Sequence, residues 1–484
     1  MPSVTSALKR PSRLLSWSLL IGWVLLGAAP SLPAAEGQGL RTPNIVYIMA
    51  DDLGYGDIGP FGQKLIQTPN LDRMAAEGMC FTQFYPGASV CAPSRATLMT
   101  GLHTGHTRIR GNRGAAGTER VPLRASDVTV AEVLRQAGYA TGAVGKWGLG
   151  EPKTEGQPNK KGFDFWFGYL NQDHAENYYP EKLWKNDLEI TLLGNKDGKK
   201  GQYSNDVFTD EAIGFIEMNR SKPFFLYLAY TIPHAVWAVP NEALREYAGV
   251  FAEEEPVLTG KIKTTTPRAM YAAMVTRLDR EVGRVLQQLR RLGLDQDTVV
   301  FFTSDNGPPD RGGIPQFFGS TGAFRGFKGS LDEGGLRAPM IVRWPGHVAA
   351  GKQSDFIWAG WDLLPTAAEL AGVIAPGWLD GVSVVSAFTG KSAQREGYLY
   401  WEIPAQPFSQ AIRIGDLKAI RTDSDEPIKV FNLREDPGEK KDLAASSRAF
   451  VTKAEDLFRT ARTPSAEWPV ADDKDGGARR KHGR

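Results

Sequence analysis

Runs of apolar residues recur along the chain and predict a buried, mostly parallel sheet. Four of them, at residues 45–50, 140–144, 224–230 and 298–303, are rich in β-branched and aromatic side chains and lack polar alternation. That pattern is typical of strands covered on both faces, as in α/β proteins. We therefore expect a sheet sandwiched between layers of helices.

Apolar residues at helical spacing predict the covering helices. Residues 270–289 place apolar side chains on one face, and Gly293 can end that helix. Residues 362–371 fit a second capped helix, whereas the polar, charged stretch 250–267 predicts a loop.

The pattern changes after about residue 390. Three segments then alternate between polar and apolar positions and predict a small antiparallel sheet, at residues 398–401, 410–422 and 428–431. A helix at 447–460 would accompany it. The expected organisation is a catalytic domain at 36–389, an α+β subdomain at 390–471 and a polar, disordered tail at 472–484.

The first 35 residues resemble a signal peptide. Basic residues up to Arg13 precede an uncharged apolar run at 14–29, and small residues allow cleavage after Ala29 or Ala35. This run is short for a bilayer span, so we expect export to the periplasm or beyond and no stable membrane anchor. With 57 Lys and Arg against 55 Asp and Glu, the net charge of +2 does not point to nucleic acid as a partner.

Polar residues follow each of the four predicted buried strands. Asp51 and Asp52 follow the first, and Asp305 and Asn306 follow the strand at 298–303. Because parallel strands present their carboxyl ends at one edge of a sheet, these oxygen ligands should converge there. Hard divalent cations prefer such ligands, so the set predicts Ca²⁺ and leaves Mg²⁺ open.

The stretch 89–101 places one of the two cysteines just ahead of the expected start of a helix. Pro93 suits the first helical turn, because it has no N–H to leave unpaired, and Gly101 can end the helix. Cys91 would then face free backbone N–H groups and the positive end of the helix dipole, which predicts an anion pocket. A packed structural thiol and a disulfide with Cys80 are the alternatives.

Residues 91–95, Cys-Ala-Pro-Ser-Arg, resemble the Cys-x-Pro-Ser-Arg signature of the formylglycine-dependent (type I) sulfatases. Residues 138–147 resemble the second signature of that family, and the likeness extends from about residue 43 to residue 443. It implies an alkaline-phosphatase-like fold and an arylsulfatase A-like hydrolysis of sulfate monoesters. It also implies that a formylglycine-generating enzyme oxidises Cys91 to an aldehyde, whose hydrated form attacks sulfur.

The resemblance assigns roles to individual residues. The implied metal ligands are Asp51, Asp52, Cys91, Asp305 and Asn306. The implied catalytic residues are Cys91 as formylglycine, Arg95, Lys146 and Lys328 on the sulfuryl oxygens, and His234 on the leaving oxygen. One position departs, because the family often has a histidine that contacts the formylglycine where this chain has Gly148.

Loop residues suggest the substrate. The segment 171–179 and Trp237 offer hydrogen-bonding and aromatic groups, so His174, Asn177 and Trp237 are candidate contacts for a sulfated carbohydrate; loop packing explains them equally well. Two other functions stay open. The same fold could serve a phosphodiesterase or phosphonate hydrolase, and Gly148 would suit a non-catalytic protein that binds sulfated ligands.

Overall fold

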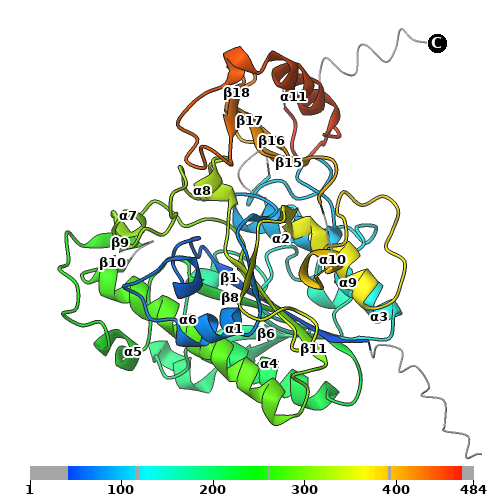
Figure 1. Ribbon diagram of the computed structural model, residues 1–484. Helices are drawn as coiled ribbons and strands as arrows, with labels where there is room; N and C mark the ends of the chain where they lie inside the picture. The colour runs from blue at the N-terminus through cyan, green and yellow to red at the C-terminus, as the bar shows by residue number, and fades with distance from the viewer. Residues whose placement is uncertain (1–41, 115–118, 260–261, 391–393, 471–484) are drawn as a thin grey trace, which may run out of the picture. The chain divides into compact units, whose positions relative to one another are not determined.

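A ten-stranded sheet forms the centre of the computed structural model, which describes residues 42–114, 119–259, 262–390 and 394–470 (Figure 1). Its strands, in order across the sheet, are β13 (Lys352–Ser354), β2 (Met79–Phe81), β12 (Met340–Arg343), β11 (Thr298–Ser304), β1 (Asn44–Asp51), β8 (Phe224–Pro233), β4 (Ala140–Lys146), β5 (Phe165–Tyr169), β6 (Lys182–Lys185) and β7 (Leu188–Thr191).

The middle of this sheet is parallel and its flanks are mixed. Strands β11, β1, β8, β4 and β5 run in one direction, whereas β12 pairs antiparallel with both β11 and β2, and β5, β6 and β7 pair antiparallel in turn. All four predicted strands are present. Each extends one to three residues further at its carboxyl end, so that Asp51 and Lys146 are the last residues of their strands.

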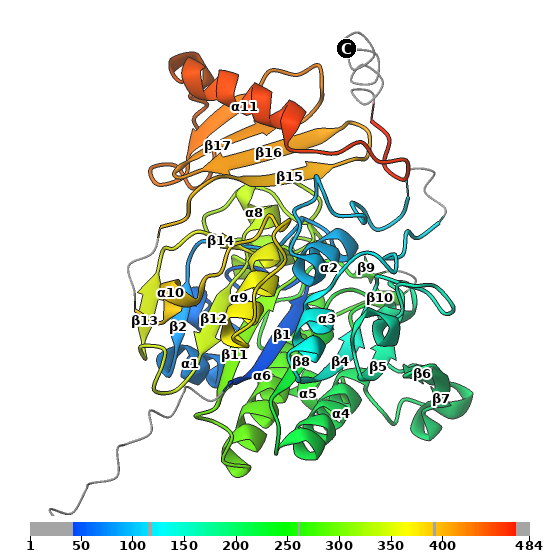
Figure 2. The same ribbon diagram turned by 90° about the vertical axis from the view of Figure 1, so that its right-hand side faces the viewer.

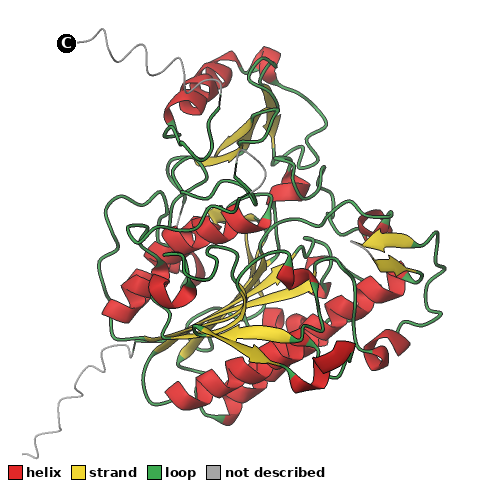
Figure 3. Cartoon of the chain, turned by 180° about the vertical axis from the view of Figure 1, so that it is seen from behind, coloured by secondary structure: helices red, strands yellow, loops and turns green. Residues whose placement is uncertain are grey.

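Helices cover both faces of the large sheet (Figure 3). Successive residues of a strand point to opposite faces, so the strands contribute side chains to two separate hydrophobic cores. Val46 and Ile48 face the core that contains α1 (Pro69–Ala76), α4 (Ser204–Asn219) and α6 (Pro267–Arg291). Tyr47 and Met49 face the other core, which contains α2 (Cys91–Thr100), α3 (Val130–Gln136) and α9 (Leu363–Leu370). The predicted helices at 270–289 and 362–371 are confirmed as α6 and α9.

Several short helices and strands lie around the large sheet and its covering helices. They are the paired strands β3 (Phe84–Tyr85) and β14 (Trp358–Ala359), and the helices α5 (Asn241–Arg245), α7 (Ile314–Phe318), α8 (Glu333–Leu336) and α10 (Val385–Phe388). The loop prediction for residues 250–267 is wrong in part. An antiparallel pair of strands, β9 (Val257–Thr259) and β10 (Ile262–Thr264), lies within it, and such three-residue strands are too short to leave a clear polarity pattern.

The predicted small antiparallel sheet is present, and it has four strands because the expected segment 410–422 forms two of them (Figure 2). It comprises β15 (Leu399–Ile403), β16 (Ser409–Ile414), β17 (Leu417–Arg421) and β18 (Lys429–Asn432). One face packs on α11 (Arg448–Thr460) through residues such as Phe458. The opposite face, with Trp401, shares a core with Tyr85 and Trp361 of the larger part of the chain.

The predicted signal peptide at 1–35 and the whole of the predicted tail at 472–484 lie outside the described residues, as does residue 471. Within the described residues, every helix is too short or too polar to span a membrane. The division at residue 390 stays a prediction.

Candidate active site

Four strand ends meet at one rim of the large sheet. Asp51 at the end of β1 lies opposite Pro233 of β8, and its neighbour Ala50 lies opposite Ser304 of β11. The residues that follow, among them His234 and Asp305, therefore emerge beside Asp51. This register explains why side chains from four distant segments come together.

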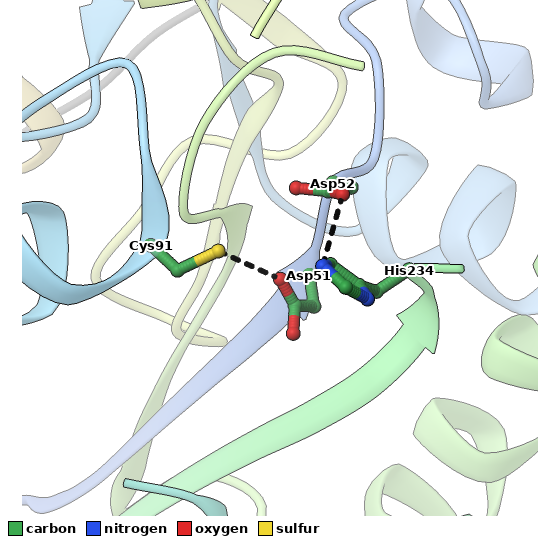
Figure 4. Close-up of side chains that lie close together, drawn as sticks. All are labelled: Asp51, Asp52, Cys91 and His234. Carbon is green, nitrogen blue, oxygen red and sulfur yellow. Dashed lines mark hydrogen bonds and ion pairs between the residues drawn. The ribbon is translucent and has the colours of Figure 1, made fainter. Parts of the chain in front are cut away.

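A left-handed backbone turns two successive carboxylates into the same site. Neighbouring residues of a regular strand point to opposite faces, but Asp52 has a φ of 66°, which non-glycine residues adopt at an energetic cost. Figure 4 shows the side chains of Asp51 and Asp52 converging with those of Cys91 and His234. Ligand atoms of these four residues all lie within 4.8 Å of one another.

Helix α2 brings Cys91 to this rim. Cys91 is the first residue of α2, and Gly101 ends the helix with a φ of 71°, as the sequence predicted. The N-cap side chain of Val90 accepts no hydrogen bond, but Asn112 Oδ1 accepts one from Ala92 N at 2.9 Å. Cys91 and Cys80 are both free and buried, so the alternative of a disulfide between them is wrong.

Three cationic side chains, Arg95, Lys146 and Lys328, face three carboxylates, which we call the acidic cluster: Asp51, Asp52 and Asp305. Lys146 Nζ lies 2.6 Å from Asp51 Oδ2 and Lys328 Nζ lies 2.6 Å from Asp52 Oδ1. Lys328 Nζ also lies 3.3 Å from Cys91 Sγ, and Cys91 Sγ lies 3.5 Å from Asp51 Oδ1. The side chain at position 91 is thus held between a carboxylate and an ammonium group.

Arg95 is fully buried and all its contacts are internal. Its Nε and Nη2 donate to Asp305 Oδ2 at 3.1 and 2.7 Å, and Nη1 donates to the carbonyl of Lys146 at 2.7 Å. This pattern fits a residue that fixes Asp305 and the end of β4. By contrast, the side chains of Lys328 and His234 each retain 16% of their exposure, so the site opens to solvent on their side.

The charges in the cluster shift the acidity of its members. Burial opposes ionisation of Asp51 and Asp52, but nearby cations, chiefly Lys146 for the first and Lys328 for the second, hold both pKa values below normal. Burial, together with the negative charge of Asp51, raises the pKa of Asp305 to about 6. All three carboxylates are therefore ionised at neutral pH.

Burial also sets the states of the thiol and the imidazole. It raises the pKa of Cys91 to about 12, despite the nearby lysines, so the unmodified side chain is a neutral thiol at pH 7. It lowers the pKa of His234 to about 4, although Asp52 Oδ2 lies 3.5 Å from Nε2. His234 is therefore a neutral imidazole in this state.

The donor set fits a hard divalent cation. Asn306 Nδ2 donates to Asp52 Oδ1 at 2.7 Å, whereas Asn306 Oδ1 is buried and has no hydrogen-bond partner among the described residues. A buried amide oxygen without a donor is a costly arrangement that a cation would satisfy. Among the residues that the structure describes, Asp305 Oδ1 accepts a hydrogen bond only from the backbone N–H of Asp52, at 3.2 Å, which leaves lone pairs for a cation.

The candidate substrate residues contact neighbouring strands and loops. Trp237 is 2% exposed and donates from Nε1 to the carbonyl of Pro233 at 3.2 Å. His174 packs edge-on against Tyr169, with ring centroids 4.9 Å apart, and the carbonyl of Asn177 accepts a hydrogen bond from the Tyr169 hydroxyl. Within the described residues, neither His174 nor Asn177 forms a hydrogen bond or ion pair with the acidic cluster.

Gly148 lies against Gln172, which belongs to the segment 171–179 but was not expected as an individual site residue. Gly148 has a φ of 81°, and a Cβ atom built there would lie 2.5 Å from Gln172 Nε2. Both polar atoms of the Gln172 amide are buried and lack partners among the described residues. The amide thus occupies the space that a side chain at position 148 would enter. Asn112 was not expected either. Asn112 and Gln172 act through contacts with residues distant in sequence, which no local sequence pattern predicts.

Comparison with known proteins agrees with this geometry. The model of the sulfatase family matches residues 43–373, and that of the N-sulphoglucosamine sulphohydrolase C-terminal region matches residues 324–457. N-acetylgalactosamine-6-sulfatase of Canis lupus familiaris is 31% identical, over 89% of this chain and 87% of its own. Human arylsulfatase A is 33% identical, over 86% of this chain and 87% of its own.

A solved structure, Ps i-CgsB in complex with k-i-k-neocarrahexaose, superposes with a TM-score of 0.75. It is 29% identical and covers 91% of this chain and 98% of its own. The family model spans most of the chain, and the relatives align over nearly all of it. The chain therefore belongs to the sulfatase family and is an enzyme that hydrolyses sulfate esters.

Proposed function

We propose that this sulfatase cleaves a sulfate monoester of a carbohydrate with a formylglycine made from Cys91 and a Ca²⁺ ion held by the acidic cluster and Asn306. The observation that carries the proposal is the position of Cys91 Sγ, 3.5 Å from Asp51 Oδ1 and 3.3 Å from Lys328 Nζ. A nucleophile at this point meets the cation ligands on one side and a sulfate-binding ammonium group on the other.

The unmodified thiol is poorly suited to the reaction. With a pKa of about 12, Cys91 carries almost no thiolate at pH 7, and the thiolate is the nucleophilic form. As formylglycine, position 91 would supply the hydroxyl of a hydrated aldehyde as the nucleophile. The resemblance of residues 91–95 to the family signature supports this conversion, and a formylglycine-generating enzyme is the implied partner during maturation.

The charge balance of the site favours a bound cation. Its three cationic side chains offset the three ionised carboxylates, so the protein groups alone give little net attraction for an anion. Asp51, Asp52, Asp305 and Asn306 would hold Ca²⁺, with Mg²⁺ as the other candidate, and the side chain at position 91 lies close enough to join them. The ion would offset the negative charge of the sulfuryl oxygens.

The protein side chains would divide the remaining tasks. Lys146 and Lys328 would bind the sulfuryl oxygens, and Lys328 is the more accessible of the two. Arg95 would keep Asp305 oriented. His234 would donate a hydrogen bond from its neutral ring to the leaving oxygen, which lowers the barrier to departure of a poor leaving group. We infer that the Gln172 amide contributes polar contacts where the family histidine is missing.

The proposal of a carbohydrate substrate rests on the relatives. N-acetylgalactosamine-6-sulfatase carries a sugar sulfate in its name, and Ps i-CgsB was solved with a carrageenan hexasaccharide. We also propose that the chain is exported after removal of residues 1–35, and that neither nucleic acid nor a stable membrane anchor is involved.

Mass spectrometry combined with a substrate panel tests this proposal. After co-expression with a formylglycine-generating enzyme, the peptide containing Cys91 should exchange one sulfur and two hydrogens for one oxygen. The mature enzyme should hydrolyse sulfated sugars and 4-nitrophenyl sulfate, Cys91→Ala should not, and Cys80→Ala should behave as the wild type. Preference for an aryl phosphodiester would favour a phosphodiesterase or phosphonate hydrolase, and binding of sulfated sugars without turnover would favour a non-catalytic protein.

A further inference from the structure

The end of β8 departs from the regular ladder of the large sheet. Met49 of β1 lies opposite Ala229 of β8 and Asp51 lies opposite Pro233, so β1 advances two residues where β8 advances four. A bulge of this kind leaves backbone groups of the longer segment without ladder partners and redirects the chain that follows it. His234 is the next residue, so contacts from outside the ladder have to fix its backbone.

Two side chains supply these contacts. Asn205, in the first turn of α4, is fully buried; its Oδ1 accepts a hydrogen bond from Thr231 N at 3.0 Å, and its Nδ2 donates to Thr231 Oγ1 at 3.0 Å. The Tyr178 hydroxyl donates to the carbonyls of Thr231 and His234, at 2.8 and 2.5 Å, so one hydrogen serves both. The N–H of His234 donates to the carbonyl of Thr231 at 3.0 Å. The backbone of residues 231–234 is thus held at both ends.

Tyr178 is itself fixed by its neighbours. Its ring stacks on that of Tyr203, with centroids 5.5 Å apart and planes 13° apart, and both residues are buried. Its carbonyl accepts a hydrogen bond from Ser204 N at 2.9 Å, directly before Asn205. Side chains locked by packing in this way hold a neighbouring group in one place. The contacts on residues 231–234 therefore come from one rigid support at the start of α4.

The imidazole of His234 has no comparable support of its own. Figure 4 shows the ring reaching from the end of β8 toward Asp51 and Asp52, and Nε2 lies 3.5 Å from Asp52 Oδ2, beyond the range of a normal hydrogen bond. Among the residues that the structure describes, none forms a hydrogen bond with this ring. The position of the imidazole therefore depends on the backbone that carries it.

We infer that Tyr178 and Asn205 are positioning residues for His234, which hold its imidazole where it can donate to the leaving oxygen. This inference rests on the role of His234 in the proposed function. Both side chains are buried and act through the backbone of residues 231–234. The segment 171–179 thus serves the reaction through Tyr178, as a support for the strand end that carries His234.

The Tyr178→Phe variant tests the inference, because it removes the hydroxyl and keeps the stacked ring. The mature enzyme is assayed on aryl sulfates with good and poor leaving groups, beside His234→Ala. Because a displacement of about 1 Å can cost about a hundredfold in rate, a smaller one in Tyr178→Phe should lower kcat/KM about tenfold for the substrate that His234→Ala affects most. Thr231→Val, which removes the hydroxyl that contacts Asn205, should act in the same direction and keeps the test open if Tyr178→Phe does not fold.

Tyr203→Phe is the matched control. The Tyr203 hydroxyl also donates to a carbonyl of the chain after β8, that of Ala238 at 2.9 Å, but it does not contact residues 231–234. Its removal should change kcat/KM by less than about twofold for every substrate. In a His234→Ala background, Tyr178→Phe should have no further effect, since the imidazole is already absent. Losses that multiply, or a dependence on the leaving group unlike that of His234→Ala, would overturn the inference.

A spectroscopic signal that does not require turnover separates this inference from the proposed function. With ¹³C-labelled histidines, the ring signal of His234 is the one among six that is missing from His234→Ala. It should shift or broaden in Tyr178→Phe and stay unchanged in Tyr203→Phe; an unchanged signal in Tyr178→Phe would refute the positioning role. If the signal shifts but His234→Ala lowers kcat/KM equally for all leaving groups, the proposed role on the leaving oxygen fails and the positioning of His234 stands.

Discussion

Replacing Lys418 by methionine tests how the small sheet supports the loop that carries Lys328. Lys418 Nζ lies 2.8 Å from Glu333 Oε1 and 3.0 Å from Glu439 Oε1, and the three side chains are fully buried. Burial would raise the pKa of Glu333, but positive charges, first that of Lys418 and then that of Arg337, outweigh it and lower the pKa to about 2.

The pKa of Glu333 gives the size of the effect. The ordinary pKa of a glutamate is 4.5, and a tenfold change in proton affinity corresponds to about 1.4 kcal/mol. The shift therefore means that the folded protein stabilises the ionised form of Glu333 by about 3 kcal/mol. Because the folded pKa lies below the unfolded one, this contribution is complete above about pH 4.5 and is lost as the pH falls through about 2. This shift reflects the charges of Lys418, Arg337 and Arg413 together. Removing Lys418 leaves two buried carboxylates without their shared counter-charge, and breaking a buried ion pair costs about 3–5 kcal/mol, so Lys418→Met should lower the free energy of unfolding by about 3 kcal/mol at pH 7.

At pH 5 the Lys418→Met variant should lose about 1–2 kcal/mol less of its free energy of unfolding than at pH 7. Without the charge of Lys418, Glu333 and Glu439 take up protons in the folded state at this pH. Urea denaturation followed by tryptophan fluorescence measures both values. The control is Lys429→Met, at an exposed position on β18, with an expected change within about 0.5 kcal/mol.

Combining Lys418→Met with Glu333→Gln should recover part of the loss, because only one buried carboxylate then lacks its partner. A loss below about 1 kcal/mol at pH 7, or the same loss at both pH values, would refute the reasoning.

Three further predictions concern the site. Gly148→His should destabilise the protein by about 1–3 kcal/mol, because position 148 has a positive φ and the Gln172 amide occupies the space of the new side chain. In thermal melts, adding Gln172→Ala should restore part of the lost stability. A Gly148→His variant as stable as the wild type would contradict the geometry. A chelator should abolish turnover of 4-nitrophenyl sulfate and Ca²⁺ should restore it, because the proposed ion would offset the negative charge of the sulfuryl oxygens. Activity that survives exhaustive chelation would count against the cation. His234→Ala should lower kcat/KM most for aryl sulfates with poor leaving groups, whereas equal losses across the series would exclude a role on the leaving oxygen.

The sequence predicted the strands that build the site because they are apolar on both faces. Residues 45–50 and 298–303 have no alternation to obscure them, and each ends in polar residues at the edge that parallel strands share. The helix at 270–289 was equally clear, because one long apolar face covers the sheet. Convergence of Asp51 with Asp305 then follows from the register alone.

Contacts between single side chains could not be predicted in the same way. Gln172 and Asn112 lie in loops, and their partners Gly148 and Ala92 are distant in sequence. The family resemblance places Arg95 on the sulfuryl oxygens. Its guanidinium instead contacts Asp305, and only the packing of α2 against the sheet decides between these directions.

The change of pattern at residue 390 does not separate the catalytic part of the chain from an independent appendage. Glu439 accepts a hydrogen bond from the backbone N–H of Glu333 at 2.8 Å, and its carbonyl accepts one from Arg325. Both contacts hold the segment that contains Lys328, whose Nζ lies between Asp52 and Cys91. The loop from β18 to α11 thus fixes the segment that carries Lys328, which we propose binds sulfate, so a change in the small sheet should affect turnover as well as stability.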